Sequence, residues 1–251
     1  IYEMKLAAPK ILQDVAIDLP ASKSISNRLL IIQALSKKGQ ILNLSEAEDT
    51  KVLKTALEEL LETIHVGHAG TAFRFLTAYL SVTPGTRILT GSERMKSRPI
   101  APLVDALRDL GATVQYVEKE GFPPLKITGN SILGGEVHIE ASVSSQFITA
   151  LMLIGPTLRN GLKIHLTGNV VSLDYIKMTA SLMRTCGAQV DLNQNAITVA
   201  PKPYSDFSIE VEKDWSAAAF WYELVLIGEI EHLLLKDVKS ESIQGDSYVS
   251  I

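Results

Sequence analysis

Apolar and polar positions along this chain alternate between helical and strand spacing in a recurring order. In residues 105–117 an apolar helical face is stopped by Gly111 and followed by an alternating strand, and residues 180–192 repeat this form around Gly187. Glycine is common just past the end of a helix, and strict alternation is typical of a half-buried strand. We therefore expect two equivalent helix–strand pairs.

Two further echoes place these pairs in a larger repeat. Leu-Thr-Gly at 89–91 returns at 166–168, 77 residues later, and Phe-Leu-Thr-Ala at 75–78 is echoed by Phe-Ile-Thr-Ala at 147–150, at an offset of 72. Self-similarity at a nearly constant offset is the signature of a repeat architecture. The pattern predicts an α/β fold (α+β in some classifications) built from βαβαββ-type units of about 70 to 80 residues.

The first unit begins at Ala21. Each unit opens with small and polar residues that lead into an apolar helix, and a strand follows. For the first unit we expect the opening helix at 26–35, a strand near 40–44 and a second helix near 49–62. The resulting prediction is that residues 21–212 form a complete lobe of three repeats.

Another unit opens at Asp214 and is followed by one strand-like run and a polar tail. Because this unit is incomplete, we expect residues 1–20 and 213–251 to form part of a second lobe whose remaining units are absent from this sequence. A partial lobe leaves apolar side chains uncovered. We expect such exposed surface around three aromatic residues, Trp215, Phe220 and Trp221. The alternative is that this helix packs back on the first lobe.

Composition narrows the class of protein. The 251 residues are 46% hydrophobic and 21% charged, which is ordinary for a soluble protein of one large domain or two smaller ones. A net charge of −4 argues against general nucleic-acid binding, and no apolar run approaches the ~20 residues that span a bilayer. The single Cys186 excludes an internal disulfide and is expected to be inert core, in a reducing, cytoplasmic setting.

The first helix start combines serines with two cations. Lys23 and Ser24 lie in the opening turn, and Arg28 lies four residues after Ser24, on the same helix face. Free N–H groups and the dipole at a helix start favour anions, and a guanidinium matches the two oxygens of a carboxylate or phosphate. The alternative interpretation is a helix cap followed by solvated charges.

The second unit repeats this arrangement. Gly70 opens a helix that carries Arg74 four residues later, and a glycine there lets a ligand approach the backbone closely. His68 in the same turn is either a structural hydrogen-bonding residue or a catalyst. A cationic run follows, in which we expect at least one residue to be a solvated charge, and Pro99 after it is well placed to start a helix. Its members are Arg94, Lys96 and Arg98.

The third unit opens with hydroxyl groups instead of cations. These suit a phosphate, although plain helix capping explains them equally well. The residues are Ser142, Ser144, Ser145 and Gln146, with Ser172 and Tyr175 after the next predicted strand. A Rossmann fingerprint, a P-loop, a serine-hydrolase elbow and a metal-ligand spacing are absent from the sequence. The motifs together indicate a binding site for a small, multiply anionic metabolite.

In this order the motifs resemble the 3-phosphoshikimate 1-carboxyvinyltransferase (EPSP synthase) family, over essentially the whole chain. The segments that carry the resemblance are 23–28, 69–74, 89–100 and 142–147. The resemblance implies the enolpyruvyl-transferase fold, in which two lobes of three α/β units close over the substrates. It also implies transfer of the carboxyvinyl group of phosphoenolpyruvate to the 5-hydroxyl of shikimate 3-phosphate, in the pathway to chorismate and aromatic amino acids, with release of phosphate.

The resemblance also assigns roles to individual residues. It implies that shikimate 3-phosphate is held by Lys23, Ser24, Arg28, Ser144, Ser145, Gln146, Ser172 and Tyr175. It implies that phosphoenolpyruvate contacts Lys23, Gly70, Arg98 and Gln146. Lys23 is the implied catalytic residue. No metal or organic cofactor is implied, the partners are the two small substrates without nucleic acid or membrane, and we expect a monomer.

Departures from the family pattern qualify this interpretation. The family commonly has Asn where this chain has His68, and Pro where it has Phe75. The acid/base residues of the family, and further cations for phosphoenolpyruvate, are expected downstream of Ile251. We therefore expect this chain to be inactive alone. The alternatives are UDP-N-acetylglucosamine 1-carboxyvinyltransferase, whose cysteine loop is not evident in this sequence, and a non-catalytic anion-binding module.

Overall fold

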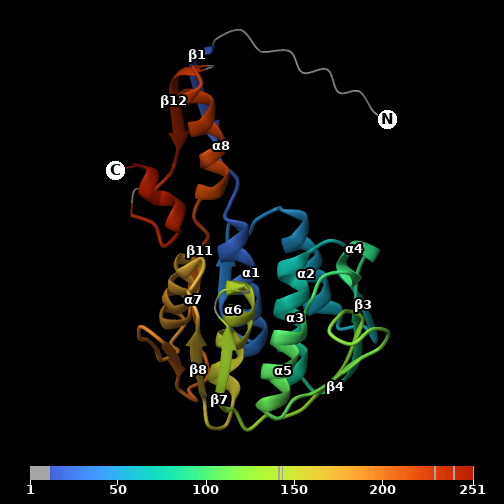
Figure 1. The fold of residues 1–251 in the computed structure, drawn as a ribbon. Coiled ribbons are helices and arrows are strands. Elements are labelled where there is room, and N and C mark those ends of the chain that lie inside the picture. Colours follow the sequence, from blue (N-terminus) through green and yellow to red (C-terminus); the bar gives the residue numbers. More distant parts are fainter. Residues whose placement is uncertain (1–11, 141, 143, 229, 240, 251) are drawn as a thin grey trace.

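The computed structural model describes residues 12–250 except 141, 143, 229 and 240. They form a large body and a smaller one, joined by two crossings of the chain (Figure 1). Within the described residues, no helix is long and apolar enough to cross a membrane. Residues 1–11, which belong to the predicted second lobe, lie outside the described part.

One four-stranded sheet and its helices form the unit that follows residue 62. Strand β3 is parallel to β4, and β4 and β5 both pair antiparallel with β6, which gives the order β3-β4-β6-β5. The elements in chain order are β3 (Thr63–His65), α3 (Gly70–Val82), β4 (Gly85–Thr90), α4 (Glu93–Lys96), α5 (Ala101–Asp109), β5 (Thr113–Tyr116) and β6 (Leu125–Gly129). Helix α5 begins at Ala101 and not at Pro99, because Pro102 already occupies its first turn.

The next unit has the same topology. Its sheet has the order β7-β8-β10-β9, again with one parallel pair followed by two antiparallel pairs. The elements are β7 (Gly135–Glu140), α6 (Ser145–Ile154), the 3-10 turn η1 (Gly155–Thr157), β8 (Leu162–Thr167), α7 (Leu173–Thr185), β9 (Val190–Leu192) and β10 (Ala196–Val199). The βαβαββ unit predicted from the sequence is confirmed. Gly111 and Gly187, which follow α5 and α7, have φ of +99° and +90°, which L side chains rarely adopt.

The first unit is built from distant parts of the chain. It contains α1 (Lys23–Ser36), β2 (Gln40–Leu42) and α2 (Glu48–Glu59), and β2 pairs in parallel with β11 (Ser208–Glu210), which follows the third unit. Helix α1 begins three residues before the predicted start. Helix α2 stops at Glu59, short of the predicted end at 62, because Leu60 turns into the left-handed region with φ of 44°.

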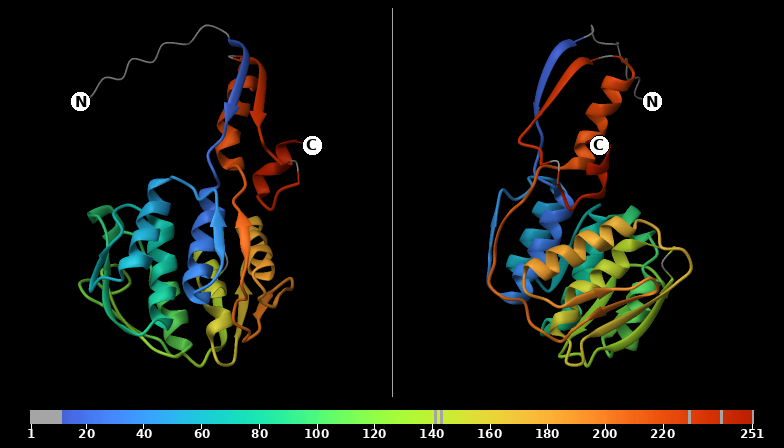
Figure 2. Two further views of the ribbon diagram at one scale, coloured as in Figure 1. Left: turned by 180° about the vertical axis from the view of Figure 1, so that it is seen from behind. Right: turned by 90° about the vertical axis from the view of Figure 1, so that its left-hand side faces the viewer.

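Three helices form the centre of the large body. α1, α3 and α6 pack against one another, and Figure 2 shows them inside a rim of strands. Each is buried nearly all round, as expected of a helix whose apolar residues are not confined to one face. Phe73 and Phe75 of α3 are both 1% exposed and are among the largest fully buried side chains. These helices therefore have fixed positions, and so do the residues at their N-terminal ends.

The smaller body combines the two ends of the described chain. Strand β1 (Leu12–Asp18) runs parallel to β12 (Ile230–Lys236), and α8 (Trp215–Leu226) packs on β12 and on the 3-10 turn η2 (Gly245–Ser250). The two chain segments that connect it to the large body form an isolated antiparallel β-bridge between Ala21 and Lys213.

The aromatic residues of α8 differ in burial. Phe220 is 72% exposed, as predicted, whereas the expected exposure of Trp215 is wrong, because that residue is 3% exposed against Leu19 and Ala218. Trp221 is partly buried in the same cluster. Trp215, in the first turn of α8, is thus buried where the chain crosses between the two bodies, whereas Phe220, later in the helix, is exposed to solvent.

Central and peripheral aromatic residues should differ in their contribution to stability. Phe73→Ala is expected to lower the free energy of unfolding by about 3–5 kcal/mol, because it leaves a cavity among closely packed helices. Phe220→Ala, at an exposed position of α8, should change it by no more than about 0.5 kcal/mol. Urea denaturation followed by circular dichroism measures both, and equal losses would contradict the assignment of the core.

Candidate functional site

A pocket of about 360 Å³ lies where several helices of the large body begin. Helices α1, α6 and α7 start at Lys23, Ser145 and Leu173, beside this pocket. The lining residues are Lys23, Ser24, Asn27, Arg28, Thr71, Ser142, Ser144, Ser145, Gln146, Val171, Ser172 and Tyr175. These described residues include two cations, several hydroxyls and no carboxylate. Together with the helix dipoles, this lining suits a phosphate or carboxylate group.

Arg28 is the buried cation of this pocket. Its guanidinium carbon lies over the rings of Phe75 and Tyr175, 5.7 Å from each ring centre, and Nε donates to Thr179 Oγ1 at 2.8 Å. Among the described residues no carboxylate forms an ion pair with it. Burial lowers the pKa of Arg28 to about 10, which still leaves it protonated at neutral pH. The pocket therefore holds an uncompensated positive charge.

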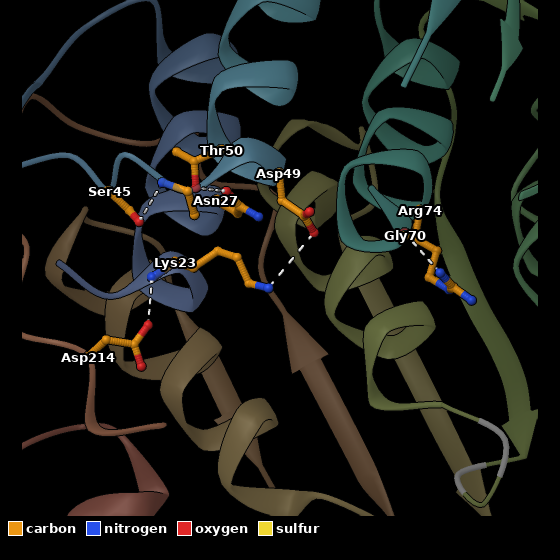
Figure 3. Close-up of polar contacts among 9 residues, drawn as sticks. Lys23, Asn27, Ser45, Asp49, Thr50, Gly70, Arg74 and Asp214 are labelled. Atoms are coloured by element: carbon orange, nitrogen blue, oxygen red, sulfur yellow. Dashed lines mark hydrogen bonds and ion pairs between the residues drawn. The ribbon is translucent and has the colours of Figure 1, made fainter. Parts of the chain in front are cut away.

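Lys23 is the first residue of α1, the helix that also carries Arg28, and Figure 3 shows its two acidic neighbours. Its backbone N–H donates to Asp214 Oδ2 at 3.1 Å, and its Nζ lies 3.9 Å from Asp49 Oδ2. Asp214 Oδ1 also accepts from the backbone N–H of Ala217, so this carboxylate caps both α1 and α8. Because the ion pair with Asp49 is long and half exposed, the ammonium of Lys23 is available to a ligand.

The serines have different local roles. Ser144 caps α6, because its hydroxyl accepts from the backbone N–H of Gln146. Ser172 precedes α7 with φ of 59° and forms no side-chain cap, so capping does not account for it. A serine in the left-handed region is uncommon, and such strained positions cluster at functional sites. Both hydroxyls line the pocket.

Two arginine side chains lie against Gly70, beside the pocket. A Cβ at Gly70 would lie 2.5 Å from Arg98 Nη1 and 2.9 Å from Arg74 Nη1. Arg74 Nη1 donates to the Gly70 carbonyl at 2.8 Å, as Arg28 Nη1 does to the Ser24 carbonyl at 2.8 Å. Burial lowers the pKa of Arg74, and the nearby charge of Arg98 adds to the shift. The repeated spacing thus produces the same backbone contact in two units.

The structure brings most of the predicted ligand residues together. Of these, the pocket lining includes Lys23, Ser24, Arg28, Ser144, Ser145, Gln146, Ser172 and Tyr175. Gly70 and Arg98 adjoin each other but are not in the lining, although Thr71, next to Gly70, is. Their roles as ligands remain predictions.

Sequence reasoning missed several residues of the site. Asn27 lies four residues after Lys23, so helical spacing offered a signal for it, and Thr71 follows the singled-out Gly70. Asp49 and Thr179 come from other helices, 26 and 151 residues from their partners Lys23 and Arg28. No local pattern identifies such partners.

The remaining motif residues have structural partners or face solvent. His68 Nδ1 lies 2.9 Å from the hydroxyl of Ser92, which caps α4. Lys96 pairs with Glu118 at 3.1 Å, and Arg94 is exposed. Within the described part of the chain, no group of His, Cys, Asp and Glu is arranged to hold a metal ion. Arg98 is therefore the member of the cationic run that lies beside Gly70.

The fold and the lining of the pocket together define a class of protein. The chain is an α/β repeat protein that gathers helix starts, hydroxyls and the buried guanidinium of Arg28 around a pocket whose lining suits a small anion. The family described as EPSP synthase (3-phosphoshikimate 1-carboxyvinyltransferase) matches residues 60–251. The chain belongs to this family.

Relatives and solved structures agree with this membership. The chain is 50% identical over 244 residues to the 3-phosphoshikimate 1-carboxyvinyltransferase of Bacteroides fragilis (strain YCH46), covering 96% of the chain and 59% of that relative. It is 37% identical over 272 residues to that of Sulfurovum sp. (strain NBC37-1), covering 92% and 61%. An EPSP synthase structure from Acinetobacter baumannii matches in fold with a TM-score of 0.78 at 20% identity, over 93% of this chain and 57% of that one. The chain therefore spans about three fifths of the length of these relatives.

Cys186 lies outside the pocket and should be unreactive in the folded protein. It is fully buried at the C-terminal end of α7, whereas the pocket adjoins the N-terminal end. Burial raises the pKa of its thiol to about 12. At pH 8.5 about half of an unperturbed thiol is ionised, against roughly one in a few thousand for Cys186. Alkylation by iodoacetamide should be far slower in the native protein than in guanidinium chloride, and equal rates would contradict this burial.

Proposed function

We propose that this chain forms the shikimate 3-phosphate side of the active site of a 3-phosphoshikimate 1-carboxyvinyltransferase. The observation that carries the proposal is the pocket in which Lys23 and Arg28 meet the hydroxyls of the α6 and α7 starts, with no carboxylate among its described lining residues. The substrates of this reaction both carry phosphate and carboxylate groups. Bringing them together requires preorganised positive groups, because two anions otherwise repel each other.

In the proposed binding mode different residues of the pocket bind different groups of shikimate 3-phosphate. The hydroxyls of Ser144, Ser145 and Ser172 hold the phosphate of shikimate 3-phosphate, and Arg28 and Lys23 neutralise its remaining negative charge, with Ser24, Gln146 and Tyr175 also in contact. A buried cation without a counter-ion is costly. A ligand anion removes that cost, which favours occupation of the pocket by a substrate over a neutral molecule.

Phosphoenolpyruvate is proposed to bind between Lys23, Gln146 and the Gly70–Arg98 pair. The absence of a side chain at Gly70 leaves room for Arg98 against the helix start, and the resulting arginine pair is positive. In the proposed reaction the 5-hydroxyl gives up its proton to a base and its oxygen adds to C2 of phosphoenolpyruvate, while a proton is delivered to the methylene carbon. Loss of phosphate and of a proton from the resulting tetrahedral intermediate then forms the carboxyvinyl ether. Lys23 is the proposed catalytic residue of this chain.

The same proposal covers organisation and setting. We propose that residues 21–212 form one substrate-binding lobe and that the smaller body belongs to a second lobe. The support is that one continuous core runs from Ala21 to Val211, whereas Leu19, Trp215 and Ala218 form a separate cluster. A monomer that acts on small molecules in the cytoplasm is the proposed state.

Binding of the acceptor substrate tests the proposed function. Isothermal titration calorimetry should show saturable binding of shikimate 3-phosphate and none of UDP-N-acetylglucosamine. Arg28→Lys should weaken shikimate 3-phosphate binding by about tenfold to a hundredfold, because lysine cannot contact Thr179, the Ser24 carbonyl and a ligand together. Arg94→Lys, a matched change at an exposed arginine, should have no effect. Equal affinities of the wild type and Arg28→Lys, or binding of the nucleotide sugar instead, would refute the proposal.

A methyl group at Gly70 should weaken the binding of one substrate, phosphoenolpyruvate, more than that of the other. Gly70→Ala places Cβ against Arg98 and is expected to displace that guanidinium. Phosphoenolpyruvate titrated into the protein saturated with shikimate 3-phosphate should then bind at least several-fold more weakly, with little change for shikimate 3-phosphate itself. Chemical-shift changes of the arginine Nε–H groups follow both titrations. Equal loss for the two ligands would disprove the separate placement of Arg98.

A further inference from the structure

Asn27 is a buried polar residue of α1 that no motif or family resemblance assigned to ligand binding. It is 0% exposed, lies between Lys23 and Arg28 in the first turns of the helix, and lines the pocket. Among the described residues, four have a buried side-chain N or O atom without a hydrogen-bond partner, and of these Asn27 is the pocket-lining one. Its unpartnered atom is Nδ2.

The orientation of this amide is determined by a neighbouring helix. Thr50 in the first turn of α2 donates its hydroxyl proton to Asn27 Oδ1 at 2.8 Å, inside the core. The hydroxyl is the donor in this contact, so Oδ1 faces Thr50 and Nδ2 faces away from it. Figure 3 shows Nδ2 on the side opposite Thr50. The backbone N–H of Ser45 also donates to Ser26 Oγ at 3.0 Å, which holds α1 to the loop before α2.

A buried amide donor without an acceptor is unfavourable, and native proteins rarely retain one without a reason. In this protein the donor belongs to a residue that lines the pocket, one turn after Lys23 and directly before Arg28. An oxygen acceptor that enters the pocket would complete its hydrogen bonding. A neutral, directional donor at this place contributes discrimination, because a ligand without an oxygen there leaves Nδ2 unpaired.

We propose that Asn27 is a further ligand-binding residue, whose Nδ2 donates to an oxygen of the bound anion, and that Thr50 is the positioning residue that orients it. The proposal rests on the proposed function for the identity of the ligand, shikimate 3-phosphate. Asn27 is one of the residues that line the pocket.

Nuclear magnetic resonance provides a direct test. The side-chain NH₂ signals of Asn27 are identified as the pair lost in Asn27→Asp, and wild-type protein is titrated with shikimate 3-phosphate and, separately, with inorganic phosphate. Shikimate 3-phosphate should move these signals downfield together with the backbone signals of Ser24. If the Ser24 signals move and those of Asn27 do not, the inference is wrong while the proposed function stands. If shikimate 3-phosphate moves neither residue, the proposed function itself fails. Inorganic phosphate shows whether a phosphate oxygen is sufficient as the acceptor.

Two variants separate the donor from its orientation. Asn27→Asp keeps an acceptor for Thr50 but replaces the donor, so affinity for shikimate 3-phosphate should fall roughly tenfold or more. Asn160→Asp, in an exposed turn, adds the same charge and should leave affinity unchanged. Thr50→Val keeps the donor but frees the amide, which should broaden the Asn27 NH₂ signals and weaken binding less than Asn27→Asp does. Unchanged affinity in Asn27→Asp would overturn the proposal. If that variant fails to fold, the Asn27 NH₂ signals are assigned by through-bond correlation to the Asn27 backbone in the wild type, and the wild-type titration still decides.

Discussion

The rest of the site depends on the burial of one charged group, the guanidinium of Arg28. It lies among core residues, over the rings of Phe75 and Tyr175, and donates hydrogen bonds to Thr179 and to the Ser24 carbonyl, and no carboxylate of the described residues pairs with it. Burying a charge is costly unless hydrogen bonds compensate it, and here α1 and α7 hold the partners in place. The packing of α1, α3 and α6 therefore serves two purposes, since the same helices that form the core also direct their positive ends at one pocket.

The repeat explains how one chain assembles such a pocket. Two units share the strand order and the helix placement, and the guanidinium-to-carbonyl contact at spacing four recurs in α1 and α3. The helix starts differ in chemistry, with an ammonium and a guanidinium at α1, hydroxyls at α6 and a glycine at α3. The helix starts of the large body thus supply positive charge and hydroxyl groups to the pocket, and beside it a backbone that a ligand can approach closely.

The crossings between the two bodies are tied to the same helix start. Asp214 accepts hydrogen bonds from the first residue of α1 and from α8, and Gln244 accepts from the backbone N–H of Trp215 and donates to the Lys213 carbonyl. The position of the smaller body is thereby linked to the residue, Lys23, that lies at the mouth of the pocket. The hydrogen bonds of Asp214 thus join the starts of α1 and α8.

The sequence by itself determined the units, their order and the helix starts that carry polar chemistry, because periodicity, glycine stops and residue spacing are local properties. It also placed Arg28 and Arg74 on the same faces as Ser24 and Gly70. Only the tertiary structure decided that β11 completes the sheet of β2, that Trp215 is buried, and that Thr50, Asp49 and Thr179 partner residues of α1. These contacts join segments far apart in the chain, and they depend on how whole helices and strands pack, which no local pattern encodes.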